Sequence, residues 1–308
     1  YQSYIINPFD NVDLNNIYIS NSNPQNQAVD HDFFISNSGQ NGKHSFNISG
    51  QFKDNLYLGI NLNSHYTEFK RIDRLTEFNY GSGSDFISTL FENDLNSIGS
   101  GFSFQIGAIY KLEYFRVGLS YQSPVWYNLT DELFQYLETS KINGIDIVDP
   151  RVINIYEYNL KTPSILSVGL ARVFGSKGLI TLQYDYTDFT NLKFNVGDGD
   201  INFINQNNTI ERSLKSAGTL KLGGEYRVSR LSLRAGYHNQ QSINKKINDK
   251  NQGFSFGLGY DLGGSLLNLG ILNQKIERAE LMYQEGLNQT INLKNLQTQF
   301  CIGLTIKL

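Results

Sequence analysis

Five charged residues stand at positions that alternate with apolar ones, and their types could form ion pairs inside an enclosed β-structure. They are Arg116, Asp185, Lys221, Glu225 and Arg234. Glu225 and Arg234 flank a tight turn at 228–230, so they face each other if the hairpin is regular. Because a buried charge needs a partner, we expect cross-strand pairing here, with Asp185 on the neighbouring strand.

The sequence does not support other kinds of chemistry. His31, His44, His65 and His238 are scattered without the spacing of a metal site. The single cysteine, Cys301, excludes an internal disulfide and a cysteine-based zinc site. No nucleophile has a base nearby and the sequence contains no phosphate-binding loop, so we expect no catalytic residue, no metal and no cofactor.

The elements that must position the charges are β-strands, because alternation of apolar and polar residues dominates the chain. The pattern predicts eleven strands, at 44–52, 56–62, 102–110, 115–121, 166–170, 180–186, 220–226, 233–237, 254–262, 267–271 and 300–308. Tight turns are expected at 53–55, 111–114, 175–178, 228–230 and 262–265. Long polar connections alternate with these turns, at 69–97, 125–163, 190–212, 239–251 and 277–295.

Short turns at one end and long loops at the other are typical of a bacterial outer-membrane β-barrel with its turns in the periplasm. A soluble β-sandwich is the alternative, because its strands alternate in the same way. Tyrosines near the strand ends favour the barrel, since they fit an aromatic girdle at the membrane surface. We therefore predict an all-β, antiparallel up-and-down barrel whose apolar face contacts membrane lipids.

Composition is compatible with this prediction. The formal net charge of −3 over 308 residues provides no basic field for nucleic acid. No stretch approaches the roughly 18 apolar residues of a transmembrane helix. The mean hydropathy of −0.35 does not exclude a barrel, because lumen residues and loops dilute the lipid-facing half.

Three stretches resemble, in order and spacing, hairpins of the outer-membrane long-chain fatty acid transporters, the FadL/TodX group, in a Bacteroidetes-like form. They are "GSGFSFQIGAIYKLEYFRVGLSYQSPVWYNLTDEL", "LITLQYDYTDFTNLKF" and "SAGTLKLGGEYRVSRLSLRAGYHNQ". The resemblance implies a monomeric barrel of 14 strands in the full protein, an even number as is usual for such barrels. It also implies passive outer-membrane transport of a hydrophobic small-molecule ligand such as a long-chain fatty acid.

The resemblance further implies one barrel domain over 1–308. Residues 1–43 would be an N-terminal loop segment, and 69–97 and 125–163 would be long extracellular loops. The family's N-terminal hatch and first three strands are not visible in the sequence, although 31–37 could supply one strand. The chain starts at Tyr1 without Met or a signal peptide, which suggests a mature or truncated product.

Two amphipathic stretches in the long loops are predicted to form short helices that capture the ligand in a groove. Apolar residues recur near helical spacing in 84–97, and Asp131 and Glu132 suit the first turn of a helix in 126–139. The predicted groove residues are Phe86, Ile87, Leu90, Phe91, Leu95, Trp126, Leu133, Phe134 and Leu137. Two alternatives remain: the helices could pack on the barrel rim without a groove, and Trp126 could anchor a strand end among lipid headgroups.

Two further points stay open. The family's ligands are anionic amphiphiles, so the resemblance implies that Arg234, Arg116 or Lys221 receives a carboxylate, unless the charges only form structural ion pairs. Barrels similar to this family also serve as non-transporting subunits of large outer-membrane secretion assemblies. The alternative function is therefore a docking scaffold within a larger complex.

Overall fold

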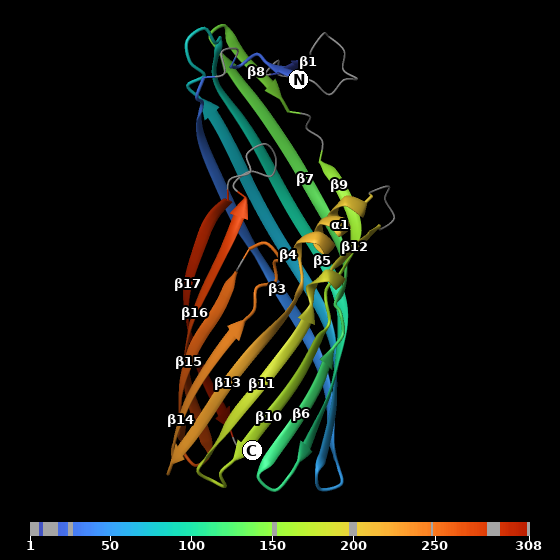
Figure 1. Cartoon of the computed structure of the whole chain (residues 1–308), viewed down its shortest axis with the longest axis vertical. Helices are drawn as coiled ribbons and strands as arrows, with labels where there is room; N and C mark the ends of the chain where they lie inside the picture. The colour runs from blue at the N-terminus through green and yellow to red at the C-terminus, as the bar shows by residue number, and fades with distance from the viewer. Residues whose placement is uncertain are drawn as a thin grey trace.

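The structure is a computed structural model that describes residues 6–8, 18–23, 27–149, 153–196, 202–247, 249–281 and 290–306. It is almost entirely antiparallel β-structure (Figure 1). The strands are β1 (Ile6–Pro8), β2 (Tyr18–Ser20), β3 (Asp30–Phe52), β4 (Leu56–Phe78), β5 (Phe86–Lys111), β6 (Phe115–Gln122), β7 (Trp126–Lys141), β8 (Gly144–Val148), β9 (Asn154–Lys161), β10 (Ile165–Val173), β11 (Gly178–Asp188), β12 (Lys193–Val196), β13 (Ser216–Val228), β14 (Leu231–Gln240), β15 (Lys250–Asp261), β16 (Ser265–Leu281) and β17 (Thr290–Ile306). One α-helix, α1, spans Ile204–Ser213. No helix in the described part of the chain has the length and apolarity to cross a bilayer.

Eleven strands form a curved wall, which we call the barrel wall. Their order is β3-β4-β5-β6-β10-β11-β13-β14-β15-β16-β17, with every neighbouring pair antiparallel. Each overlaps one of the eleven predicted segments, so the all-β fold and the strand assignments are confirmed. The predicted 254–262 runs one residue past β15, and 307–308 lie outside the described residues. The five tight turns lie together at one end, at the bottom of Figure 1. Among the described residues β3 pairs only with β4 and β17 only with β16, so the sheet has two open edges.

A second part of the sheet, which we call the extension, rises beyond the barrel wall (Figure 1). Strands β3, β4 and β5 have 23, 23 and 26 residues, whereas about 9–11 suffice to cross a bilayer. The upper half of β5 pairs with β7, and β7 pairs with β8 and β9. The extension thus consists of the upper parts of β3, β4 and β5 together with β7, β8 and β9.

Two prolines separate the extension from the barrel wall. Pro124 lies between β6 and β7, and Pro163 lies between β9 and β10. Because proline has no N–H to donate to a sheet, strand pairing is interrupted there. The adjacent groups remain satisfied, since the Val125 amide donates to Thr162 Oγ1 at 2.8 Å and the Thr162 amide donates to the Val125 carbonyl at 3.0 Å.

Three local predictions are wrong. Residues 84–97 and 126–139 form no helices but belong largely to β5 and β7, and residues 30–43 belong to β3 rather than to a loop. The backbone of these segments is paired over long, regular registers with neighbouring strands. In β5 and β7 apolar side chains lie on both faces of the sheet, which imitates helical spacing in the sequence. The one described α-helix lies in the long connection at 190–212.

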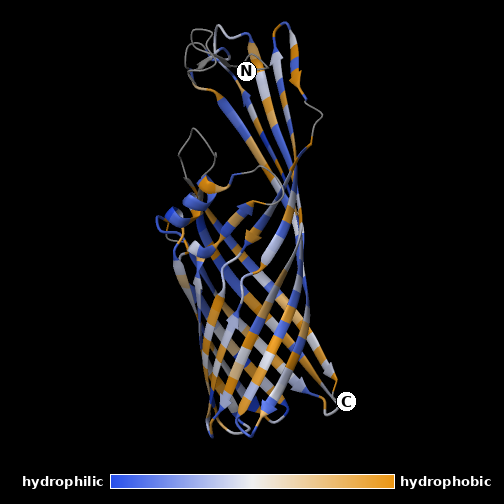
Figure 2. Cartoon of the chain, turned by 90° about the vertical axis from the view of Figure 1, so that its right-hand side faces the viewer, coloured by the Kyte–Doolittle hydropathy of each residue, from blue (hydrophilic) through white to orange (hydrophobic). Residues whose placement is uncertain are grey.

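Burial is inverted relative to a water-soluble protein. The largest fully buried side chains belong to Asn63, Ser103, Ser123 and Thr139, which are all polar. Large apolar side chains are exposed instead, such as Phe46 at 63% and Phe256 at 60%. Apolar bands repeat across the barrel wall in Figure 2. We call the face that carries them the outer face and the opposite face the inner face. An apolar surface of this extent requires hydrocarbon around it, which decides against a soluble sandwich.

Candidate functional site

A ladder of side-chain amides crosses the inner face of β3, β4, β5 and β6. Asn47 Nδ2 donates to Asn61 Oδ1 at 2.6 Å. Asn61 Nδ2 donates to Gln105 Oε1 at 3.0 Å, and Gln105 Nε2 donates to Gln122 Oε1 at 2.7 Å. The strand registers place one amide per strand in the same row. This part of the inner face is therefore polar but uncharged.

Glycines open space next to the ladder. Gly59 pairs with Gly107, and Gly118 pairs with Gly169, all on the inner face. They line a cavity of about 770 Å³ together with the amides. This volume lies in the range of about 300–1,000 Å³ that is usual for small-molecule sites. Since a polar, neutral lining does not hold an apolar solute strongly, the cavity is suited to passage rather than to tight binding.

Ion pairs occupy the inner face on the other side of the barrel wall. Arg234 Nε lies 2.6 Å from Glu225 Oε2, and Arg234 Nη1 donates to Asn268 Oδ1 at 2.7 Å. Lys221 Nζ lies 2.7 Å from Asp185 Oδ2 on the neighbouring strand. The predicted pairing of Glu225 with Arg234 is confirmed, while Asp185 pairs with Lys221 rather than joining them.

Arg116 lies apart from these pairs. Its Nη1 donates to the carbonyls of Leu112 and Phe115, at 2.7 Å and 2.9 Å. These bonds close the tight turn between β5 and β6. The structure therefore places Arg116 at the end of the barrel wall and gives it a structural contact.

Replacing Arg234 by Met is expected to lower the free energy of unfolding by about 2 kcal/mol, the usual scale for a hydrogen bond to a charged group. The substitution leaves Glu225, whose side chain is only 12% exposed, with Arg227 alone. Lys70→Met is the control, because the side chains of its ion pair with Asp94 are 48% and 32% exposed and such pairs contribute less than about 1 kcal/mol. Urea unfolding in lipid vesicles measures both, and equal losses would contradict the difference in burial.

The zone where the barrel wall meets the extension holds two of the best-buried side chains of the described residues, Asn63 and Ser103. Ser103 Oγ lies 2.8 Å from His65 Nε2 and 3.3 Å from Asn63 Nδ2. The His65 ring meets the Tyr127 ring edge-on, with centroids 5.8 Å apart. Gly101 allows this approach, since a Cβ there would lie 2.7 Å from the Tyr127 ring. We call these five residues the waist.

Four of the predicted groove residues lie on the inner face of the extension as two apolar pairs, with the polar pair of Asn93 and Gln135 between them. Leu95 pairs with Leu133 across β5 and β7, and Phe91 pairs with Leu137. Their register continues from the barrel wall without a shift along β4 and β5, so this apolar patch lies on the same face as the cavity. We call it the apolar patch.

The other predicted groove residues do not join the apolar patch. Leu90, Phe134 and Trp126 fall on the outer face by alternation, where Trp126 pairs with Phe102. Trp126 also stacks on Phe104 with centroids 6.4 Å apart, a position that suits an aromatic anchor. Phe86 and Ile87 lie at an irregularity in the pairing of β5 with β7.

An aromatic cluster borders the extension beside α1. The Tyr158 ring lies 5.7 Å from that of Phe194 and 5.4 Å from that of Phe203, between centroids. Tyr158 also donates from its hydroxyl to Asp131 Oδ2 at 3.1 Å. Burial, together with the nearby Asp131 carboxylate, raises the pKa of Tyr158 above its ordinary value, so the hydroxyl stays protonated and keeps donating.

Sequence reasoning missed the amide ladder and the waist. Their residues stand on the polar side of each alternating repeat, so the sequence shows their face. Their mutual contacts depend on strand register, and Asn63 and Ser103, which meet across β4 and β5, lie 40 residues apart in the sequence. One feature of the sequence could have indicated these contacts: consecutive strands carry polar residues of similar type at the same distance from the tight turns.

The chain was compared with known families and proteins. The model of the family described as outer membrane protein transport protein (OMPP1/FadL/TodX) matches residues 22–265. No curated protein matches the sequence significantly.

Two solved structures show a similar fold. The toluene transporter TbuX of Ralstonia pickettii has a TM-score of 0.52 at 12% identity, over 90% of this chain and 69% of that one. A Pseudomonas aeruginosa FadL homologue has a TM-score of 0.52 at 14% identity, over 88% of this chain and 67% of that one. Both confirm the barrel fold.

Proposed function

The chain belongs to the OMPP1/FadL/TodX family of outer membrane transport proteins, and from this premise we propose that it conducts hydrophobic compounds such as long-chain fatty acids passively across the outer membrane. Members of the family are transporters and not enzymes. The protein resides in the outer membrane, with the outer face in lipid. The observation that carries the proposal is the shared inner face of the apolar patch and the cavity.

Capture takes place on the apolar patch. Phe91, Leu95, Leu133 and Leu137 present apolar side chains from two paired strands, on the face that leads into the barrel wall. Each CH₂ of an acyl chain that leaves water for such a surface gains about 0.8 kcal/mol. Capture therefore needs no charged partner, and the family's amphiphilic ligands can be held by their tails.

Passage from the patch leads past the waist into the cavity. Because His65, Asn63 and Ser103 satisfy one another's hydrogen bonds, a passing apolar solute leaves no polar group unpaired. Beyond the cavity on the same inner face, Lys221, which pairs with Asp185, provides the cation for a ligand carboxylate. The Lys221 side chain is more exposed than that of Arg234, which Glu225 and Asn268 already occupy.

Uptake of radiolabelled oleate by a Gram-negative host without its own transporter tests the proposal. Cells that carry the protein should take up oleate faster than cells without it. Gly118→Trp, which fills the cavity, should reduce uptake to the host background. A Cβ at Gly118 meets its nearest atom at 3.9 Å, so the substitution begins without a clash. Gly264→Trp is the control, because Gly264 lies in the turn between β15 and β16, away from the cavity, with nothing within 4 Å of its Cβ position.

A docking scaffold is the second candidate function, and the extension favours it. The outer face of β4 and β5 there carries the ion pairs Lys70 with Asp94, at 3.2 Å, and Arg74 with Glu92. Such a polar, regular sheet surface beyond the membrane suits contact with another protein. Oleate uptake equal to that of cells without the protein would support the scaffold and contradict transport.

A further inference from the structure

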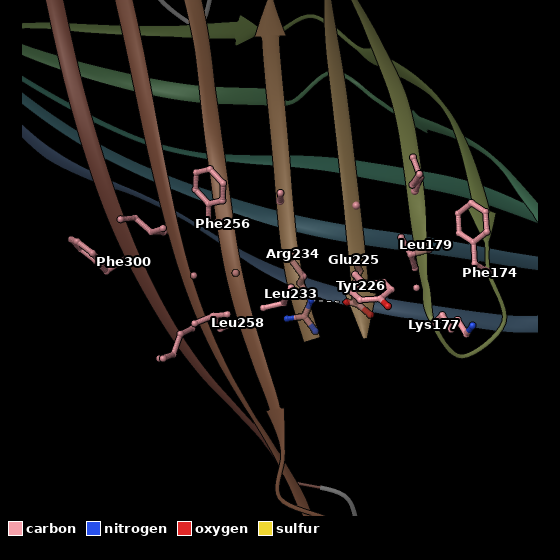
Figure 3. Close-up of a pocket in the computed structure, with 18 residues that line it drawn as sticks. Phe174, Lys177, Leu179, Glu225, Tyr226, Leu233, Arg234, Phe256, Leu258 and Phe300 are labelled. Atoms are coloured by element: carbon pink, nitrogen blue, oxygen red, sulfur yellow. Dashed lines mark hydrogen bonds and ion pairs between the residues drawn. The ribbon is translucent and has the colours of Figure 1, made fainter. Parts of the chain in front are cut away.

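We propose that the outer face of β11, β13, β14 and β15, close to the tight turns, binds one anionic phospholipid. The site is a groove of about 1,040 Å³, shown in Figure 3. Lipid binding at this site requires only that the protein lies in the membrane and that the groove exists. The proposal therefore does not depend on the proposed transport. We call it the lipid groove.

Small residues create the lipid groove. Along one row of the outer face, Ile180 pairs with Gly224, Gly224 with Ala235, and Ala235 with Phe256. The rows on either side carry large side chains, with Leu222 paired to Tyr237 and Tyr226 paired to Leu233. The adjacent strands β13 and β14 therefore carry only the small residues Gly224 and Ala235 in this row, and large apolar side chains stand in the rows on both sides.

The lining of the lipid groove is apolar and suits hydrocarbon. Phe256, Ile271 and Phe300 continue the same row across β15, β16 and β17. Figure 3 shows Phe256 and Phe300 on one side of the groove, and Phe174 on the other. Because this row faces the bilayer, the molecule next to it comes from the membrane, and an acyl chain fits its apolar lining.

A fixed cation stands at the edge of the lipid groove. Lys177 lines it from the turn between β10 and β11. Two backbone hydrogen bonds hold this residue: its amide donates to the Phe174 carbonyl at 3.1 Å, and its carbonyl accepts from the Arg227 amide at 2.8 Å. The turn packs tightly on β13, since a Cβ at Gly178 would lie 2.0 Å from the Glu225 carbonyl oxygen.

A second cation stands over one of the residues that line the lipid groove. The Arg172 guanidinium stands over the ring of Phe174, 5.1 Å from its centroid, and Phe174 lines the lipid groove. Within the described residues neither Lys177 nor Arg172 forms an ion pair. The one carboxylate of the lining, Glu225, pairs on the inner face with Arg234 and Arg227. The edge of the groove is thus positively charged.

A ligand that fits an apolar groove bordered by two cations without ion pairs has an acyl chain and a negatively charged headgroup. An anionic phospholipid has both. The short turns of such barrels lie on the periplasmic side, so the lipid belongs to the periplasmic leaflet of the outer membrane. Basic residues at this depth recognise anionic headgroups. A neutral hydrocarbon would use the apolar lining but would gain nothing from Lys177 or Arg172.

Native mass spectrometry of the full-length protein tests the proposal, after equilibration in nanodiscs with equal amounts of phosphatidylglycerol and phosphatidylethanolamine. We expect one phosphatidylglycerol to be retained in preference to phosphatidylethanolamine. Lys177→Gln and Arg172→Gln should each reduce this preference about fivefold, as expected for one membrane-facing cation. Lys53→Gln and Lys111→Gln, in turns away from the lipid groove, should leave it unchanged.

Filling the groove provides an independent test. Gly224→Leu should abolish the retained lipid, and the variant should fold because a Cβ there has its nearest contact at 3.8 Å. Gly50→Leu on the outer face of β3 is the matched control and should retain the lipid. Retention after Gly224→Leu, or a preference that survives loss of both cations, would overturn the proposal. Equal retention of both lipids by the unaltered protein would overturn it as well. None of these outcomes bears on oleate uptake.

Discussion

Replacing Leu95 and Leu133 together by Asp is expected to weaken oleate binding at least about tenfold, because each apolar side chain contributes about 1.5–3 kcal/mol when it is buried. The two residues face each other across β5 and β7 in the apolar patch. Carboxylates there would also repel the ligand's own carboxylate. Equilibrium binding of radiolabelled oleate to the protein in detergent measures the loss.

The matched control uses the opposite face of the same strands. Leu90 and Phe134 fall on the outer face of the extension, so Leu90→Asp with Phe134→Asp should leave oleate affinity unchanged. Equal losses in the two double variants would show that capture does not depend on the inner face. The apolar patch would then have no special role.

The second large effect concerns the lipid-facing surface of the barrel wall. Leu119→Arg places a cation on the outer face of β6 and is expected to destabilise the folded protein by about 2–4 kcal/mol in a bilayer. Ser120→Arg, at the next residue, places the same side chain on the inner face and should cost little. Both side chains are exposed. The difference between the two losses of stability therefore shows which face of the barrel wall is in contact with hydrocarbon.

Equilibrium unfolding in vesicles measures this pair of variants. The expected result is a large loss for Leu119→Arg and a small one for Ser120→Arg. A larger loss for Ser120→Arg than for Leu119→Arg would mean that the face assigned as inner is the one in contact with lipid. Similar losses would mean that neither face contacts lipid preferentially.

The barrel wall could be predicted from the sequence because the membrane makes its pattern strict. One face meets hydrocarbon and the other does not, so a polar residue on the outer face is costly. Tight turns such as 228–230 also fix the register locally, which is why the pairing of Glu225 with Arg234 could be predicted. The position of Arg116 could not, since its partners are backbone carbonyls of its own turn.

The extension could not be predicted because it lies beyond the barrel wall and its two faces are less different. Phe91 and Leu95 lie on one face of β5, while Leu90 lies on the other. Such a mixture gives nearly helical spacing in the sequence, whereas pairing with β4 and β7 determines the strand. The prediction therefore joined apolar residues of two faces into one groove.

The contacts of the waist were out of reach for a different reason. Ser103 lies 40 residues from Asn63 and 38 from His65 in the sequence, because β4 and β5 are long, and their contacts require the register of β4 with β5 over its full length. The alternating pattern of the sequence indicates that these positions are polar. It does not indicate which polar side chains contact one another.

The central claim is that a hydrophobic compound moves along the inner face from the apolar patch to the cavity. Photo-crosslinking with a diazirine analogue of oleate, followed by peptide mapping, tests it most directly. The account predicts adducts at Leu95, Leu133 and the cavity residue Ile109 that disappear when unlabelled oleate is added. Adducts that respond to oleate only at outer-face residues such as Leu90 and Phe134 would contradict it.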